Sequence, residues 1–380
     1  MRLFVILLLG CASLAHAAEL TVQTLEVKGK NIRGEAYEKG QIEIPFVQAR
    51  QPVDEALASK INNQLFTRML GVMAPRQPGA YLTGVDIEGT ERQQFSVSRN
   101  DGRVLTIVFD IEGCGAHCEN YNVIYSFDAR NGQLITVSNL FTPDGLRELA
   151  LRMGKEQVSR YRQQLVRLNQ ELKVAKTKDN ADDLADINDR IEFTTNCLSE
   201  ETGEADMPAA TSASLLQSAQ HYRYELADRG IKVTVGRCSN HAMRALDDVN
   251  EVTLALPYAG LAPHLSEYGK AVLLNEGQAH ASESIYGQLL RGTLAGKTAI
   301  TMLLEKDADN AVSGTYFYDK FRAPIPLKGT LNGPTLELKE QVEGKPETEA
   351  TFHLTKTGDG LKGLWISKAG KKQFDVRVGP

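Results

Sequence analysis

Short runs of alternating apolar and polar residues, interrupted by one helical period, mark the first region of the chain, residues 18–140. Leu20 to Val27 and Gly34 to Val47 follow the two-residue period of strands. After Pro52, apolar residues recur four apart, which predicts that they share one face of a helix. They are Leu57, Ile61, Leu65 and Met69.

Two hairpin signals in this region indicate that its strands are antiparallel. Asn-Asp-Gly at 100–102 and Arg-Asn-Gly at 130–132 each interrupt an apolar alternation. Such pairs of Asn or Asp with Gly favour the tight turns that join antiparallel strands. One helix against an antiparallel sheet is the economical packing for these elements. The strands joined by the two turns are predicted at 95–98, 104–109, 121–127 and 133–137.

A long helical pattern opens the second region, residues 141–274. Thr142 precedes Pro143 and Asp144 at the start of a helix whose apolar residues follow a heptad spacing. The pattern breaks at 176–180, and a second, shorter helix follows. We expect an inserted helical hairpin, which serves packing rather than chemistry. The heptad residues are Tyr161, Leu165, Leu168 and Leu172, and those of the second helix are Leu184, Ile187 and Ile191.

The rest of this region is predicted as loop and strands. Residues 199–211 are acidic, small and polar, which is typical of a surface loop. Two pairs of adjacent aspartates, at 182–183 and 247–248, are expected on solvated faces rather than as acid and base. The strands of the region are predicted at 222–226, 231–235 and 251–256.

Beyond a linker at 275–284, the third region, residues 285–380, contains an internal echo. Arg291 to Thr298 reads R-G-T-L-A-G-K-T, and Lys328 to Thr335 reads K-G-T-L-N-G-P-T, so each places a Gly-containing turn between strands. About eight short strands in up-and-down order can close into a barrel. Besides the two arms of the first hairpin, the strands are predicted at 312–318, 325–331, 336–338, 351–354, 361–366 and 374–378.

The predicted fold class is therefore α+β. An antiparallel sheet with packed helices and a helical-hairpin insertion is followed by an all-β, up-and-down, barrel-like C-terminal domain of about eight strands. Tyr316 and Trp365 are expected to fill the interior of the barrel, and a role for them in ligand binding is the alternative.

The N-terminus is typical of a secretory signal peptide, residues 1–17. Arg2 supplies a positive charge, Leu3 to Leu9 is apolar, and Ala15-His16-Ala17 fits the cleavage signal. We expect cleavage after Ala17 and a periplasmic or secreted protein. The alternative is a lipoprotein box ending at Cys11, although the leucine two residues before that cysteine is bulky for such a box. No apolar run is long enough for a transmembrane helix, which needs about 20 residues.

Composition changes this picture by excluding some partners. The chain has 380 residues, of which 42% are hydrophobic and 24% charged, as in ordinary folded proteins. Its formal net charge is −5 and its sequence pI is about 5.9. Nucleic-acid-binding domains usually lie above a pI of about 9, so no nucleic acid partner is expected.

Cysteine usage agrees with export. After cleavage, Cys114, Cys118, Cys197 and Cys238 remain. Four cysteines in an oxidising compartment allow about three pairings, and the simplest joins Cys114 to Cys118 and Cys197 to Cys238. A metal site made of Cys114, His117 and Cys118, or free thiols, are the alternatives, although no second close pair of ligands accompanies this motif.

The sequence lacks the common catalytic motifs. The chain contains no Gly-x-Ser-x-Gly elbow, no phosphate loop, no dinucleotide fingerprint and no His-x-x-x-His pair. We therefore predict no catalytic residue, no metal, no cofactor and no enzyme activity. The densest constellation surrounds His117 in a loop bracketed by two cysteines. Such a loop loses little ordering entropy on binding, so Gly115, Ala116, His117 and Tyr121 are the candidate binding residues.

A series of short motifs, from residue 18 to about 268, resembles an exported domain of unknown function. That domain typically reads I-P-Y, then I-N on a helix, G-A-H-P, Y-N-F-D, T-G and D-L-F, followed by a T-D-K-G-L hairpin and a V-T-I-P-Y strand. The corresponding motifs here are Ile44-Pro45-Phe46, Ile61-Asn62, Gly115-Ala116-His117, Tyr125 to Asp128, Asn131-Gly132, Leu140-Phe141, Leu226 to Ile231 and Val252 to Tyr258.

The resemblance implies work at the cell wall. The family domain forms the extracellular part of a lysozyme-sensing anti-sigma factor and the non-catalytic N-terminal part of certain peptidoglycan deacetylases. The last region resembles small bacterial barrel modules with a recurring G-T-Y-x-Y strand, here Gly314 to Tyr318. This chain differs from the family in having Cys118 where proline often follows the histidine, and in its helical hairpin.

We therefore expect a non-enzymatic binding protein of the cell envelope. Its expected partner is peptidoglycan or, more sharply, a lysozyme-type muramidase that it senses or inhibits. An acidic protein meets a cationic enzyme faster, which agrees with the net charge. The alternatives are a carrier that holds a small apolar ligand in its barrel, and a cysteine- or metal-dependent enzyme using Cys114, His117 and Cys118. The oligomeric state is not predicted.

Overall fold

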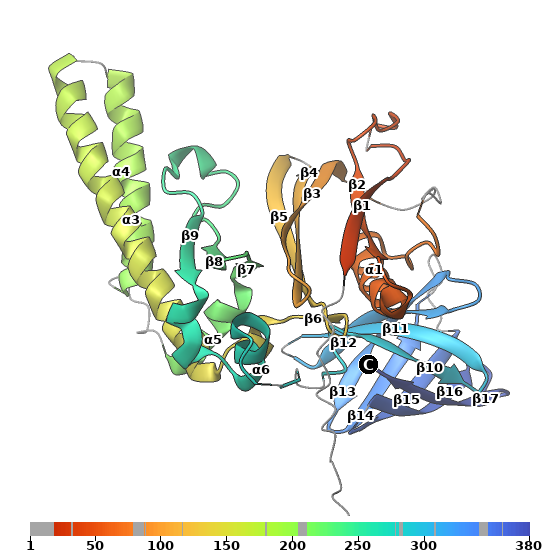
Figure 1. Cartoon of the computed structure of the whole chain (residues 1–380). Helices are drawn as coiled ribbons and strands as arrows, with labels where there is room; N and C mark the ends of the chain where they lie inside the picture. Colours follow the sequence, from red (N-terminus) through yellow and green to blue (C-terminus); the bar gives the residue numbers. More distant parts are fainter. Residues whose placement is uncertain are drawn as a thin grey trace, which may run out of the picture.

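The structure is a computed structural model that describes residues 19–380, except 32, 79–86, 88, 116, 179–180, 204–210, 278, 281–283, 308, 342–348 and 359. The expected signal peptide and the alternative lipoprotein box thus lie outside the described residues. Three packed units follow one another along the chain (Figure 1). Within the described residues, no helix is both long and apolar enough to cross a membrane.

The first unit combines a two-stranded ribbon, a four-stranded antiparallel sheet and helix α1. A parallel bridge between Ile42 and Gln93 connects the ribbon to the sheet. Apolar side chains from both and from α1 form one core. The elements are β1 (Leu20–Glu26), β2 (Glu43–Ala49), the 3-10 turn η1 (Pro52–Asp54), α1 (Glu55–Leu70), β3 (Thr90–Asn100), β4 (Val104–Cys114), β5 (Cys118–Asp128) and β6 (Gln133–Leu134).

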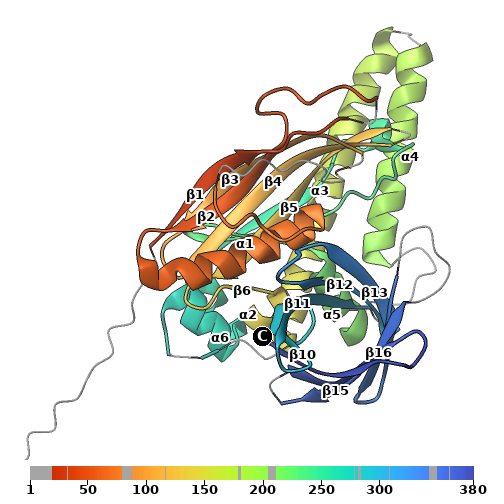
Figure 2. The ribbon, with the colours of Figure 1, turned by 90° about the vertical axis from the view of Figure 1, so that its right-hand side faces the viewer.

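Helix α1 lies between the first sheet and the barrel (Figure 2), which explains why some of its polar residues are buried. Ile61 and Leu65 belong to the core of the first unit. Asn62 is also buried, because its amide pairs with the backbone N–H and C=O of Val47, both at 2.7 Å. Gln64, which is 0% exposed, pairs in the same way with the segment that leads into the barrel.

The second unit packs helices on a three-stranded antiparallel sheet around its own core. The predicted helical hairpin is present as α3 and α4, which project from the rest of the molecule (Figure 1). The elements are α2 (Val137–Leu140), α3 (Pro143–Lys178), α4 (Ala181–Thr202), α5 (Ser212–His221), β7 (Arg223–Leu226), β8 (Gly230–Val235), η2 (Arg244–Leu246), β9 (Val252–Pro257), η3 (Tyr258–His264), α6 (Glu267–Gly269) and the π-helical turn η4 (Lys270–Leu274).

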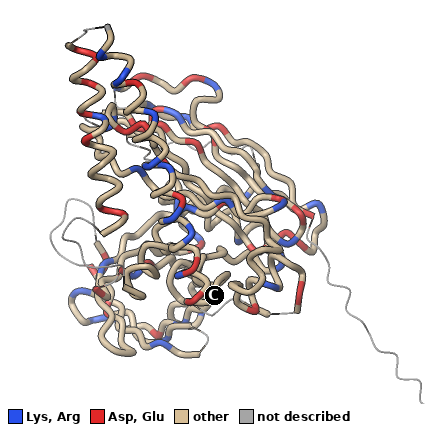
Figure 3. Tube along the Cα trace, turned by 90° about the vertical axis from the view of Figure 1, so that its left-hand side faces the viewer, with Lys and Arg blue, Asp and Glu red and all other residues tan. Residues whose placement is uncertain are grey.

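The projecting helices are stabilised as solvated helices usually are. Tyr161 and Leu168 of α3 and Ile187 of α4 are buried, and the two helices pack against each other. Residues of both charge signs are distributed along the two helices (Figure 3), and ion pairs link neighbouring turns, such as Arg160 with Glu156. Pairs four residues apart support a helix by about 0.2–0.5 kcal/mol each.

The third unit is the predicted barrel. Eight strands close in sequence order, since the first, β10, also pairs with the last, β17. The predicted α+β class with an antiparallel C-terminal barrel is therefore confirmed. The strands are β10 (Leu289–Leu294), β11 (Thr298–Lys306), β12 (Ala311–Tyr318), β13 (Pro324–Asn332), β14 (Thr335–Glu340), β15 (Ala350–Thr357), β16 (Gly360–Ser367) and β17 (Gln373–Gly379).

The internal echo corresponds to two hairpins of this barrel. The first turn places Ala295 and Gly296 at positive φ, and the second places Gly333 there. The first loop has three residues, 295–297, and the second has two, 333–334. Tight hairpin loops need positive φ at such positions, and glycine adopts it without steric cost. The strands inferred from the echo therefore lie in β10, β11, β13 and β14.

Several predicted elements differ from the structure. The strand predicted from Gly34 begins only at Glu43, because two glycines at positive φ, Gly34 and Gly40, turn the chain before it. The strand predicted at 133–137 ends at Leu134, and Val137 begins the helical turn α2. The loop predicted at 199–211 is helical through Thr202, and residues 204–210 are outside the described part.

Helix α5 was not predicted from the sequence. Its residues, S-A-S-L-L-Q-S-A-Q-H, are mostly small and polar. A capping box begins it: the Thr211 hydroxyl accepts from the Ser214 N–H at 3.1 Å, and the Ser214 hydroxyl accepts from the Thr211 N–H at 2.8 Å. Ser rather than the usual Glu or Gln in the box leaves a weak sequence signal.

Candidate functional site

The predicted binding loop is the tip of the β4–β5 hairpin. Cys114 and Cys118 lie opposite each other where the two strands end, and they form a disulfide. Between them, the Gly115 N–H donates to the carbonyl of His117 at 3.0 Å. Ala116 lies outside the described residues. The predicted pairing of these cysteines is confirmed, and the tip is a covalently closed loop on a long antiparallel hairpin.

Tyr121 extends this surface along β5. Its side chain is 42% exposed, and its ring borders Gly113 on the neighbouring strand, where an added Cβ would lie 3.1 Å from the ring. The glycine thus leaves room for the tyrosine to lie against the hairpin near its tip. An exposed aromatic ring at a fixed position is a common anchor for a protein partner.

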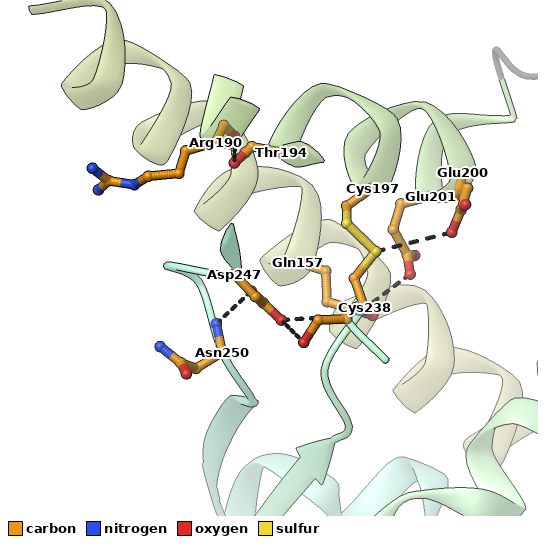
Figure 4. The surroundings of a disulfide bond; sticks show 10 residues. Gln157, Arg190, Thr194, Cys197, Glu200, Glu201, Cys238, Asp247 and Asn250 are labelled. Carbon is orange, nitrogen blue, oxygen red and sulfur yellow. Dashed lines mark hydrogen bonds between the residues drawn. A yellow bond between two sulfur atoms is a disulfide. The ribbon is translucent and has the colours of Figure 1, made fainter. Parts of the chain in front are cut away.

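The second predicted disulfide, Cys197–Cys238, is also present, and it fixes the 236–250 loop between β8 and β9 (Figure 4). It ties this loop to α4. Asp247 holds the loop from inside, since its carboxylate accepts from the backbone N–H and the hydroxyl of Ser239, at 3.3 and 2.7 Å, and from the Asn250 N–H at 2.9 Å.

The expectation of a solvated face at 247–248 is therefore wrong. Asp247 is 5% exposed and serves the loop as an internal acceptor. Asp248 forms an ion pair with Arg190 of α4 at 2.7 Å and accepts from Gln164 of α3 at 2.6 Å. The two carboxylates connect the loop to the helical hairpin, whereas Asp182 and Asp183 are exposed as expected.

The 236–250 loop contacts the hairpin tip. The imidazole rings of His117 and His241 stack with centroids 4.3 Å apart and an interplanar angle of 25°. Nδ1 of His241 lies 3.0 Å from a carboxylate oxygen of Glu119, and Arg244 donates to the same oxygen at 2.5 Å. We call His117, Glu119, Tyr121, His241 and Arg244 the tip site.

Electrostatics favour the ionised form of Glu119. The hydrogen bond with His241 and the charge of Arg244 hold the pKa of its carboxyl below the ordinary value, against an opposing effect of burial. The carboxylate therefore stays charged at neutral pH and joins the two segments. Since the Glu119 side chain is 44% exposed, solvent screens this attraction.

Sequence reasoning found one half of the tip site and missed the other. His117 and Tyr121 belong to the hairpin that the cysteines marked. Glu119, His241 and Arg244 were not among the predicted residues. The one sequence signal for His241 is its position three residues after Cys238, which the disulfide fixes. The contact between this loop and the hairpin tip depends on how the first and second units pack against each other. No local sequence pattern predicts that packing.

Cysteine chemistry is excluded at the tip by the disulfide. Glu112, Cys114 and Cys118 are the group of possible metal ligands that lie close together in the described part of the chain. Both sulfur atoms are bonded to each other, so neither is a thiolate that could attack a substrate or hold a metal. The alternative of a cysteine-dependent site using Cys114 and Cys118 is therefore not supported.

The interior of the barrel contains a packed apolar core, and the carboxylate-bearing residue Glu340 is buried as well. Tyr316 is buried, as predicted, and Trp365 is half-buried and stacks on Phe374. Both donate to one carboxylate oxygen of Glu340, at 2.5 and 2.8 Å respectively. Burial and the hydrogen bond to Glu340 raise the pKa of the Tyr316 hydroxyl. Tyr316 and Trp365 thus give the buried Glu340 carboxylate hydrogen-bond donors inside the barrel unit.

Comparison with known proteins finds similarity to a solved structure. No family model and no curated protein matches the chain. The chain is similar to the crystal structure of a member of the duf3298 family from Bacteroides fragilis, with 13% sequence identity, a TM-score of 0.39, and coverage of 69% of this chain and 99% of that chain. The anti-sigma and deacetylase contexts that the sequence resemblance implies stay predictions.

Proposed function

We propose that this protein is an exported, non-enzymatic binding protein of the cell envelope that recognises a wall-associated partner with its tip site. The observation that carries the proposal is the construction of that site. Two segments far apart in the chain, each closed or anchored by a disulfide, meet through His117, Glu119, His241 and Arg244. Disulfides of this kind belong to proteins that fold in an oxidising compartment.

The exposed side chains suit recognition of another protein. Tyr121 is 42% exposed, and Met243, between His241 and Arg244, is 39% exposed. Tyr, Met and Arg are enriched at protein interfaces. Because the disulfides order the tip before any partner arrives, little conformational entropy is lost on binding. A stable, ordered surface with exposed aromatic and thioether groups supports binding better than chemistry.

For the partner, we propose a cationic lysozyme-type muramidase, which the protein senses or inhibits. The net charge of −5 favours encounter with a cationic enzyme, and the motif series from residue 18 to 268 supports a wall context. Isolated peptidoglycan is the second wall-associated partner to examine.

The test is a calorimetric titration of the exported, oxidised protein with lysozymes of several types, with cell-wall lysis followed in parallel. We expect saturable binding near one to one. Replacing both Tyr121 and Met243 by Ala should weaken it at least about tenfold, since a few buried anchors usually carry most of the affinity. Phe321→Ala is the matched control, because this phenylalanine is 70% exposed but lies on a barrel loop. Full affinity in the double variant would contradict the assignment of the tip site.

Absence of binding to every lysozyme would remove the muramidase as partner. Sedimentation with purified peptidoglycan then tests the broader proposal. If neither lysozyme nor peptidoglycan binds, the proposed function is overturned.

A further inference from the structure

Besides the tip site, the molecule has a recess of about 350 Å³ beside helix α1. Residues 46–49 of β2 form one wall. The other parts come from α1, from residues 74–76 and 78 after it, and from Arg322 in the loop between β12 and β13. We call it the α1 recess. Since α1 lies between the first sheet and the barrel (Figure 2), both units contribute to it. Pockets for small ligands usually measure about 300–1,000 Å³, so this recess suits a small molecule.

Two guanidinium groups stand at one end of the α1 recess. Arg322 donates to the carbonyl of Ala74, whose own N–H donates to the Asn63 side chain at 3.2 Å. Arg76, two residues further on, donates to the Asp319 carbonyl at 3.5 Å. These bonds place both cations near the Asn63 position of α1. Each guanidinium carries five N–H groups, and each donates one hydrogen bond to the described residues, so donors remain for a ligand.

The two arginines concentrate positive charge at this end of the recess. Within the described part of the chain, neither Arg76 nor Arg322 forms an ion pair. Burial and the like charges of Arg76 and Arg291 lower the pKa of the Arg322 guanidinium. The charge of Asp319 opposes this shift but does not cancel it. An anion between Arg76 and Arg322 would relieve their repulsion, and guanidinium N–H groups match the two oxygens of a carboxylate.

An acidic side chain lines the opposite end of the α1 recess. Glu55 is the first residue of α1, and Asn63 lies eight residues further along the same helix. At a rise of about 1.5 Å per residue, that spacing is about 12 Å. Glu55 is exposed, and it has no ion-pair partner among the residues that the structure describes. The recess thus has a carboxylate at one end and two guanidinium groups at the other, which is the charge pattern that a zwitterion needs.

The β2 wall presents peptide groups between these ends. The N–H and C=O of Val47 point away from β1, since both pair with the Asn62 side chain. The Arg50 N–H points the other way and donates to the Glu19 carbonyl at 2.9 Å. Because the direction alternates along a strand, the N–H and C=O of Ala49 also point away from β1, on the side of the recess. This edge of β2 can pair with the backbone of a ligand.

We propose that the α1 recess binds a short peptide with free termini, about three residues long. Arg76 and Arg322 bind its C-terminal carboxylate, and Glu55 binds its N-terminal ammonium group. The N–H and C=O of Ala49 pair with a peptide bond of the ligand, which thereby lies beside β2 as a further short strand. Three extended residues span about 10 Å, which fits charged ends about 12 Å apart with room for the hydrogen bonds. The site is independent of the proposed function, since no residue of the α1 recess belongs to the tip site.

The experiment is a calorimetric titration of the exported, oxidised protein with the tripeptide L-alanyl-L-alanyl-L-alanine. We expect saturable binding of one tripeptide per chain. The C-terminal amide of this tripeptide should bind at least about tenfold more weakly, because it lacks the carboxylate that forms charge-assisted hydrogen bonds. The N-acetyl tripeptide should bind several-fold more weakly, since it offers Glu55 no ammonium group. Inorganic phosphate, which has the charge but no peptide bond, should also bind more weakly than the tripeptide.

Variants of the charged ends test the same assignment from the protein side. Arg76→Gln and Arg322→Gln should each weaken binding of the tripeptide at least about tenfold and reduce its advantage over the amide. Glu55→Gln should remove only its advantage over the N-acetyl tripeptide. Arg162→Gln is the matched control and should leave the affinity unchanged, because this arginine is exposed on α3, outside the recess.

The protein with both Tyr121→Ala and Met243→Ala should bind the tripeptide as the wild type does, so failure of the tip site and failure of the α1 recess are distinguishable. Should Arg322→Gln fold poorly, the comparison of the tripeptide with its amide on the unaltered protein decides. Equal affinity for these two ligands would overturn the proposal, and so would wild-type affinity in both arginine variants or the absence of binding. Phosphate binding as tight as that of the tripeptide would show a general anion site and overturn the assignment to a peptide.

Discussion

The carboxylate of Asp101 receives two hydrogen bonds from the guanidinium of Arg99, from Nε at 3.0 Å and from Nη2 at 2.7 Å. Arg99 is 3% exposed, and its remaining terminal nitrogen donates to the hydroxyl of Tyr258 at 3.0 Å. Tyr258 in turn donates to the carbonyl of Ala227 at 2.6 Å. The turn between β3 and β4 is thereby connected to the second unit by a buried cation that depends on one acidic partner.

Asp101→Asn should destabilise the protein by about 1–2 kcal/mol at neutral pH, because it leaves a buried cation without its counter-charge. The loss is modest because the Asp101 side chain is 33% exposed, so solvent screens its attraction to Arg99. Urea unfolding of the two proteins at pH 7 measures the difference. Asp110→Asn is the control, since Asp110 is 54% exposed and lies 3.8 Å from its basic partner, and it should change little.

The same pair predicts a pH dependence. Burial would raise the pKa of Asp101, but hydrogen bonds from the Val104 and Arg103 amides and from Arg99 outweigh it and lower the pKa below its ordinary value. A depressed pKa in the folded state means that the stabilisation is present above the unfolded value of about 3.9. It is lost as the pH falls through the lower, folded value. The wild type should thus lose its advantage over Asp101→Asn as the pH drops below about 4. An advantage that stays constant down to pH 2.5 would contradict this account.

The disulfides give a second prediction, because they close loops of very different length. The cysteines of the first are 4 residues apart in sequence, and those of the second are 41 apart. On the chain-entropy model, their removal costs about 2 and about 4 kcal/mol, respectively. Cys197→Ser with Cys238→Ser should therefore lower the urea midpoint more than Cys114→Ser with Cys118→Ser. Equal losses, or the reverse order, would show that the smaller loop stabilises the native state in another way.

Local patterns predicted the barrel well and the tip site only in part. Alternation and Gly-containing turns are properties of adjacent residues, so the strands around Ala295-Gly296 and Gly333 could be found without tertiary information. The burial of Gln64 could not, since it depends on a barrel segment more than two hundred residues away. His241 lies at the tip for the same reason: its position depends on Cys197, on Asp247 and on the packing of two units.

Gln64 gives the third prediction, which tests how α1 joins the barrel. Its amide donates to the carbonyl of Gly287 at 2.7 Å and accepts from the N–H of Leu289 at 3.1 Å. Gln64→Leu keeps the volume but leaves a buried N–H without a partner, which costs about 2 kcal/mol. Gln163→Leu on the exposed side of α3 is the control and should change stability by less than about 0.5 kcal/mol. Thermal unfolding of both variants provides the comparison. A Gln64→Leu protein as stable as its control would mean that water or a shift of the segment satisfies Leu289.

The last prediction concerns glycines whose missing side chain lets barrel strands approach. A Cβ on Gly329 would lie 1.7 Å from the carbonyl oxygen of Glu337 on the paired strand, and one on Gly292 would lie 1.8 Å from that of Arg377. These two glycines occupy the same place in the internal echo, after Lys328 and Arg291. Gly329→Ala must therefore push β13 away from β14, and we expect a loss of about 3 kcal/mol.

The single tryptophan of the chain makes this loss measurable in the barrel itself. Trp365 stacks on Phe374 with ring centroids 5.5 Å apart, so its fluorescence should report the unfolding of this unit. Gly154→Ala is the opposite control, because nothing lies within 4 Å of its Cβ position on helix α3. It should stabilise the protein by about 0.5–1 kcal/mol, since alanine forms helices better than glycine. If Gly329→Ala unfolds at the same urea concentration as wild type, the prediction that β13 and β14 approach too closely for a Cβ at this position is wrong.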